Sequence, residues 1–267
     1  QEEKIMNLEK LFEKALRAYF AAHRVSRDGL EDAVADAYAD WSDKPLDELD
    51  GKTPREYVAA VTDPAEIAEG ALAGVRNGGE PSPLFADRVA EVPAASARLT
   101  EVLESDEPER VRVAAAELLH RAGAVPVETY IDLVFDPDTP DNLRETLIEQ
   151  LEYTDGAAGP LLARLGEAEG ENRKILAELL VACGARGEKV YGLLEELVRE
   201  PGNAAYASQL IARYGDDSAL PLLAELSAKC DYADYIELRN AAEMLGGDVP
   251  LRFDWSGDAT YKKIKGE

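Results

Sequence analysis

Two histidines and two cysteines are the residues of this chain best suited to catalysis or metal binding. His23 falls at the end of a predicted helix, where a cation suits the helix dipole, and no second histidine lies within metal-ligand spacing of it or of His120. Cys183 and Cys230 are far apart, and two thiols alone cannot complete a tetrahedral zinc site. We therefore expect no metal site and no cofactor, and we expect both cysteines to be buried free thiols.

One glycine-containing run has the look of a phosphate-binding loop. The run Gly-Ala-Arg-Gly-Glu-Lys at 184–189 lacks the required spacing, and no predicted strand precedes it, so we interpret it as a turn between repeats. Carboxylates are so numerous, at 54, that close pairs arise by chance. We therefore single out no acid/base pair and no catalytic residue, and the sequence favours a protein without enzymatic activity.

The elements that position these residues follow a repeat of about 31 residues. Five predicted helices run into a glycine, which suits the position after a helix because it adopts the left-handed conformation without strain. Counted back from that glycine, positions −8, −5, −4 and −1 are apolar, with only Glu152 and Asp155 charged, and they share one helical face. The glycines are Gly123, Gly156, Gly184, Gly215 and Gly246. Position −5 holds Leu118, Leu151, Leu179, Leu210 and Ala241.

Another helix precedes each of these five, with Pro, Asp or Gly between the two. The five first helices are expected at 97–105, 127–135, 158–168, 188–199 and 218–229. One helical hairpin cannot bury its apolar face, whereas stacked hairpins share a core. With leucine pairs such as Leu118-Leu119 and Leu179-Leu180, residues 95–247 resemble the short bacterial HEAT-like repeats. That resemblance implies an all-α fold, a right-handed α-solenoid of about five hairpins.

A helical region precedes the repeats. Amphipathic helices are expected at 5–22 and 29–41, and Pro-containing capping signals at Thr53 and Asp63 start two more, the last ending near Val75. The run 77–81, Asn-Gly-Gly-Glu-Pro, predicts a linker. We therefore expect an N-terminal helical region at 1–79, a repeat array at 80–247 and a tail at 248–267, with a short strand possible only at 251–255.

The charge of the chain restricts its partners. The formal net charge is −25, and residues 91–250, with 14 basic against 32 acidic side chains, carry −18 of it. Such a surface repels phosphate backbones and anionic lipids, so we expect no nucleic-acid and no membrane partner. No apolar run approaches the length of a membrane span, and the opening Gln-Glu-Glu-Lys is unlike a signal peptide, so a cytoplasmic location is expected.

One set of polar residues repeats with the helices. Position −6 bears a side-chain carbonyl in all five, and we call these residues the polar row: Glu117, Gln150, Glu178, Gln209 and Asn240. The row lies off the apolar stripe, so we expect it along the exposed, concave face, where amides can bind the backbone of an extended peptide. Tyr153, Tyr206 and Arg213 lie at neighbouring positions. The alternative is an ordinary solvated helix face.

These observations favour a non-catalytic HEAT-repeat protein that binds a protein or peptide, or acts as a scaffold, with basic segments among the candidate partners. One alternative is an enzyme or lyase-type ligand-handling subunit on a HEAT-like scaffold. Another is an antitoxin- or immunity-like inhibitor of a basic partner, since Trp41 and the run Leu-Asp-Gly-Lys-Thr-Pro at 49–54 resemble a segment of some bacterial antitoxin domains.

Overall fold

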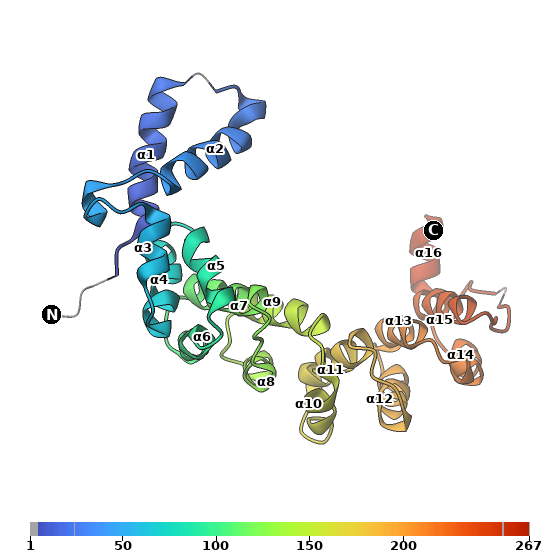
Figure 1. Cartoon of the computed structure of the whole chain (residues 1–267). Helices are drawn as coiled ribbons and strands as arrows, with labels where there is room; N and C mark the ends of the chain where they lie inside the picture. The colour runs from blue at the N-terminus through green and yellow to red at the C-terminus, as the bar shows by residue number, and fades with distance from the viewer. Residues whose placement is uncertain (1–4, 24, 253, 267) are drawn as a thin grey trace. The chain divides into compact units, whose positions relative to one another are not determined.

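The computed structural model of the chain describes residues 5–23, 25–252 and 254–266, and it is helical throughout (Figure 1). Helices account for 69% of the structure, and no strand occurs among the described residues, which confirms the all-α prediction. No helix in those ranges is both long and apolar enough to cross a bilayer. Residue contacts divide the chain into two compact units, unit 1 at residues 1–150 and unit 2 at residues 151–267.

Unit 1 begins with four helices, and the starts of the last two agree with the capping signals at Thr53 and Asp63. Thr53 Oγ1 accepts the backbone N–H of Glu56, whose carboxylate accepts the N–H of Thr53, so both halves of the capping box are formed. Asp63 Oδ1 accepts two backbone N–H groups in the same way at the next helix. The four helices are α1 (Leu8–Ala22), α2 (Leu30–Ser42), α3 (Pro54–Ala60) and α4 (Pro64–Arg76).

The expected linker at 77–81 lies inside unit 1. It leads into a helix that the sequence pattern did not predict, α5 (Pro83–Glu91), and α5 packs against both α3 and α4. The linker segment itself is held close to α4, because a Cβ on Gly74 would come within 2.2 Å of the backbone oxygen of Glu80. The expected boundary at 79/80 is therefore no break in the packing, and the contacts place the division at 150/151 instead.

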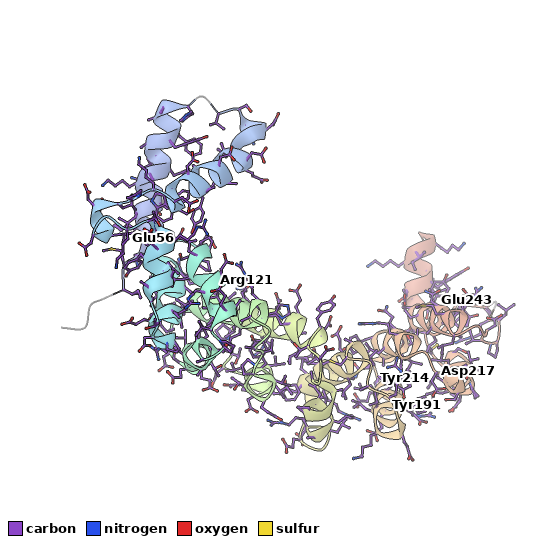
Figure 2. All side chains as sticks on the ribbon, viewed as in Figure 1. Glu56, Arg121, Tyr191, Tyr214, Asp217 and Glu243 are labelled. Carbon is purple, nitrogen blue, oxygen red and sulfur yellow. The ribbon has the colours of Figure 1, made fainter. Side chains whose placement is uncertain are left out.

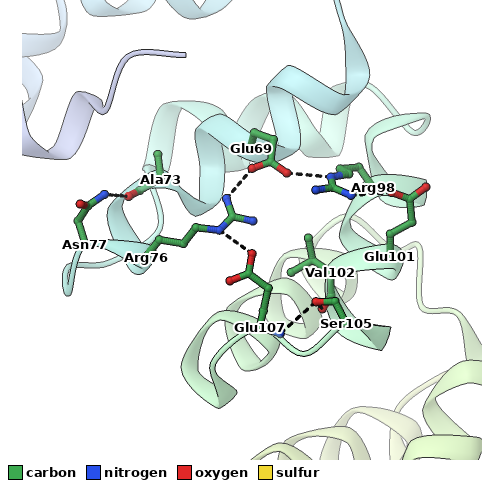
Figure 3. Close-up of polar contacts among 9 residues, drawn as sticks. All are labelled: Glu69, Ala73, Arg76, Asn77, Arg98, Glu101, Val102, Ser105 and Glu107. Carbon is green, nitrogen blue, oxygen red and sulfur yellow. Dashed lines mark hydrogen bonds and ion pairs between the residues drawn. The ribbon is translucent and has the colours of Figure 1, made fainter. Parts of the chain in front are cut away.

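The remaining helices of unit 1 are α6 (Ala95–Glu104), α7 (Glu109–Arg121), α8 (Val127–Phe135) and α9 (Asp141–Glu152), whose last two residues belong to unit 2. A charged network ties α4 to α6 and to the connection between α6 and α7 (Figure 3). Arg76 contacts Glu69 at 2.5 Å and Glu107 at 2.9 Å, and Glu69 also contacts Arg98 at 2.8 Å. The Arg76 side chain is only 25% exposed, so this network is better shielded from solvent than an isolated surface pair.

Unit 2 consists of three helix pairs and a terminal helix. The pairs are α10 (Ala158–Ala163) with α11 (Gly170–Ala182), α12 (Glu188–Arg199) with α13 (Ala204–Tyr214), and α14 (Leu220–Ser227) with α15 (Tyr232–Met244). Within each pair the two helices pack together, and the second helices also contact one another, α11 against α13 and α13 against α15. Figure 1 shows α11, α13 and α15 following one another in one layer and the first helices in another.

The repeated leucines take the role that the alignment predicts, and four of the five glycines follow a helix end within two residues, whereas Gly156 lies four residues beyond the end of α9 at Glu152. All five terminal glycines have positive φ, between 64° and 85°. Four of them, Gly123, Gly156, Gly184 and Gly246, have open space where a Cβ would stand, so the backbone conformation rather than crowding selects glycine. The position −5 leucines are buried, with exposures of 4%, 0%, 0% and 2% for Leu118, Leu151, Leu179 and Leu210.

The C-terminal tail packs onto the last pair and ends in a helix, α16 (Ala259–Lys265), that was not expected. Arg252 donates to the backbone oxygen of Cys230 at 2.7 Å, and its guanidinium lies 3.9 Å from the ring centroid of buried Trp255. Asp258 accepts the backbone N–H of Tyr232 at the start of α15. No strand forms at residues 251, 252, 254 and 255. Position 253 of the possible strand lies outside the described residues.

Candidate functional site

Three members of the polar row lie on the contacting second helices of unit 2. Glu178 is on α11, Gln209 on α13 and Asn240 on α15. The apolar residues at positions −8, −5 and −4 of these helices turn inward, which directs position −6 outward. Gln209 and Asn240 are exposed, and the side chain of Glu178 is 38% exposed. We call the surface around these three residues the second-helix face.

Side-chain contacts run across this face from helix to helix. The hydroxyl of Tyr206 on α13 donates to the backbone oxygen of Lys174 at 3.2 Å and lies 3.4 Å from a carboxylate oxygen of Glu178. Arg213 approaches the other oxygen of Glu178 at 3.8 Å, and Gln209 donates to Glu237 on α15 at 3.2 Å. Burial, and then the charge of Glu178, raises the pKa of Tyr206, so the phenol stays protonated as a donor at neutral pH.

The unit 1 members of the polar row behave differently from each other. Glu117 on α7 is exposed, although burial first and Glu80 second raise the pKa of its carboxyl group. Gln150 on α9 is only 8% exposed, and its Oε1 lies 3.0 Å from the hydroxyl of buried Tyr130. A buried hydroxyl requires a partner. The amide oxygen of Gln150 is thus used internally, which departs from the exposure expected for this row.

The other predicted residues are spread over both units. Tyr153 is 76% exposed, beyond the end of α9. His23 is exposed, with its ring stacked on that of Tyr19 at 4.3 Å. Cys183 and Cys230 are free thiols, as expected, but only half-buried, and burial raises the pKa of each. Within the described residues, no group of three or more His, Cys, Asp and Glu side chains is placed to hold a metal ion.

Residues 184–187 of the run at 184–189 form the turn between α11 and α12, as the sequence indicated, and its last two residues begin α12. Its central amide does not face an open anion site. The N–H of Gly187 donates to the hydroxyl of Tyr214 at 3.0 Å, so this amide is already satisfied by the neighbouring repeat. A P-loop needs its backbone N–H groups free to surround a phosphate, and this turn offers no such cradle.

A half-buried acid in unit 1 is not apparent from the sequence. Glu9 on α1 lies near Tyr38 of α2 and Ser82 at the start of α5, and Glu9 Oε1 is shielded from solvent without a well-aligned hydrogen bond. Burial raises the pKa of Glu9 to about 7, with Ser82 acting in the opposite direction and Glu13 adding to the rise. In the sequence, Glu9 looks like the polar side of an amphipathic helix, and only the packing of α4 and α5 reveals its burial.

Comparison with known proteins adds no family to this description. No family model, no curated protein and no solved structure matches the chain. The resemblance to HEAT-like repeats therefore rests on the period, the leucine pairs and the terminal glycines alone.

Proposed function

We propose that this chain is a non-catalytic module that binds a protein or peptide, or acts as a scaffold, on a right-handed, HEAT-like solenoid of helical hairpins. The observation that carries the proposal is the second-helix face of unit 2. Three second helices contact one another in succession, and each presents a member of the polar row at its surface. Such a face is extended and open, which suits the capture of another chain better than the enclosure of a small substrate.

The chemistry of the face fits an extended peptide. Gln209 and Asn240 each offer a donor and an acceptor, the pair of groups that a peptide backbone needs. One helical turn beyond Asn240, Met244 is 70% exposed, and its flexible thioether can pack against varied side chains. Glu178 is already engaged by Tyr206 and Arg213, so we assign it to positioning these neighbours rather than to direct capture.

The double variant Gln209→Ala/Asn240→Ala tests this role. Both residues are exposed, so the fold should persist, while the loss of two hydrogen-bonding side chains should weaken capture of the native partner about tenfold. The measurement is quantitative mass spectrometry of proteins retained from the native lysate. The matched control is Lys189→Ala/Lys229→Ala, two exposed residues of the α12 and α14 segments, away from this face. Equal recovery by both double variants would rule out the second-helix face as the capture surface.

Duplex DNA should not bind this chain at physiological salt. The net charge is −25, and most basic residues of the second helices are already paired with carboxylates. Arg121 contacts Asp87, Arg173 contacts Glu196 and Glu200, and Lys174 contacts Glu171. Fluorescence anisotropy with a labelled duplex of about 20 base pairs should therefore stay flat at about 150 mM salt, because the net negative charge repels the phosphate backbone and these paired side chains are not free to displace counterions. Saturable binding that weakens as salt rises would contradict the prediction.

A second candidate function, inhibition of a basic partner, is favoured by the acidity of the chain. Such an inhibitor associates fast at low salt and slows steeply as salt rises, because electrostatic attraction steers the encounter. Peptide capture through amide hydrogen bonds depends much less on salt. The salt dependence of the association rate with a captured partner separates the two functions.

A further inference from the structure

Beside the second-helix face, unit 2 has a groove along the turns that join one hairpin to the next. We call it the turn groove, and its volume is about 870 Å³. It runs past the α11–α12 turn and the α13–α14 turn to Leu245 at the end of α15. Figure 2 labels Tyr191, Tyr214 and Asp217 in this part of the chain. Its charged and aromatic lining residues are Arg186, Glu188, Tyr191, Tyr214, Asp216 and Asp217.

Two tyrosines form the aromatic side of the turn groove. Tyr214 is held in place because its hydroxyl accepts the N–H of Gly187 at 3.0 Å and its side chain is only 6% exposed. The ring of Tyr191 lies 6.3 Å from that of Tyr214, tilted by 45°. The guanidinium of Arg186 lies over the Tyr214 ring, 4.8 Å from its centroid. A guanidinium at that distance is attracted by the ring face. The contact of Arg186 with the Tyr214 ring thus shows that this part of the groove can bind a cation.

The turn groove carries more negative charge than the single positive charge of Arg186 neutralises. Three carboxylates line it, Glu188, Asp216 and Asp217, and none of them forms an ion pair in the part of the chain that the structure describes. Asp216 accepts the backbone N–H of Ser218, and hydrogen bonds from Ser218 lower the pKa of its carboxyl group, so it is ionised at neutral pH. Arg186 donates to the backbone oxygen of its neighbour Ala185. The groove therefore has unpaired negative charge beside two tyrosine rings, of which Tyr191 is partly exposed and Tyr214 is buried beneath Arg186.

We propose that the turn groove binds the guanidinium of an arginine side chain presented by a basic protein segment. The planar guanidinium can stack on a tyrosine ring while its N–H groups reach carboxylates at the rim, whereas a lysine ammonium offers only a point charge. Surplus negative charge on the groove and on the whole chain complements a basic segment. The site lies at the turns and shares no residue with the polar row, so it stands or falls separately from the proposed function.

The first experiment titrates the full chain, labelled with ¹⁵N, with N-acetyl-arginine methylamide and follows backbone amide resonances by NMR. We expect saturable shifts at Gly187, Gly215 and Ser218, which border the groove. The citrulline counterpart has nearly the same shape without the charge and should cause none. Equal shifts with citrulline, or unsaturable shifts spread over the acidic surface, would overturn the proposal. Free arginine should bind no more tightly than the capped form, and tighter binding would indicate a metabolite site instead.

Variants then separate a cation site from an anion site. Asp217→Asn should weaken the capped arginine about two- to fivefold, as expected for one exposed ion pair. Glu169→Gln makes the same charge change at the turn inside the α10–α11 hairpin and should leave binding unchanged. Arg186→Ala removes a competing cation, so it should strengthen binding by about two- to fivefold. Weaker binding after Arg186→Ala, or saturable binding of inorganic phosphate that this change abolishes, would contradict the proposed cation site.

Discussion

Replacement of Glu9 by glutamine should stabilise unit 1 by about 3 kcal/mol at pH 8 and leave its stability unchanged below about pH 4. Burial raises the pKa of Glu9 from 4.5 to about 7 in the folded chain. The folded state therefore holds this proton more tightly than the unfolded state does. The stabilisation is fully present below about pH 4.5 and is lost as the pH rises through about 7, at about 1.4 kcal/mol per pKa unit. Glutamine mimics the protonated acid at every pH.

The neighbours of Glu9 do little to stabilise its negative charge when the carboxyl group ionises. Glu13, one turn along α1, adds negative charge rather than removing it. Tyr38, which faces Glu9 from α2, has its own pKa raised by burial first and by Glu9 second, and therefore remains neutral. From α4, a Cβ on Gly74 would come within 3.0 Å of Glu9 Cγ, so the stem of this side chain packs closely against α4. Ser82 is the one polar neighbour that lowers the pKa of Glu9.

The chain's two tryptophans allow this effect to be assigned to one unit. Trp41 lies in unit 1 and Trp255 in unit 2, so incorporation of 5-fluorotryptophan gives one ¹⁹F resonance for each. Urea unfolding is followed at both resonances at pH 4, 6 and 8 for the wild-type chain and for Glu9→Gln. The Trp41 transition of the wild type should fall with pH while that of the variant should not, and Trp255 serves as the internal control. Parallel pH dependence of both proteins at Trp41 would show that Glu9 ionises freely.

Leu179→Ala should destabilise unit 2 by about 2–5 kcal/mol, the range for truncation of a fully buried leucine. Leu179 is 0% exposed on α11, at the repeated position −5. The loss should lower the urea midpoint at the Trp255 resonance and leave the Trp41 transition in place. The matched control is Leu251→Ala, because Leu251 is 57% exposed in the same unit and should change stability by less than about 0.5 kcal/mol. Equal midpoints for Leu179→Ala and Leu251→Ala would show that position −5 is not part of the core.

Sequence periodicity predicted the long helices well because their signals are local. The expected helices at 127–135 and 188–199 coincide with α8 (Val127–Phe135) and α12 (Glu188–Arg199). In each, a run with a clear apolar stripe is bounded by Pro, Gly or Asp, so neighbouring residues alone define its ends. The helix expected at 158–168 ends earlier, at Ala163, three residues before Gly166.

The features that the sequence did not predict depend on contacts between residues that are distant in the sequence. The run at 77–81 has the composition of a linker, yet it packs on α4, because the glycine at position 74 lets the two segments approach. Gln150 is buried beside the hydroxyl of Tyr130, which comes from a different helix, and the sequence pattern of α9 does not show this contact. Tyr214 sits on the apolar stripe at position −1, so its sequence position indicates core, and only the neighbouring turn at Gly187 reveals its role in the turn groove.

The most direct test of the central claim, that the second-helix face of unit 2 captures a partner, is photo-crosslinking in the native cell. A photo-reactive amino acid placed at Asn240, exposed on α15, should form a covalent adduct with one partner protein. The same amino acid at Glu196, exposed on the first helix α12, should form no such adduct. Adducts from both positions with the same protein, or from Glu196 alone, would contradict the assignment of capture to the second-helix face.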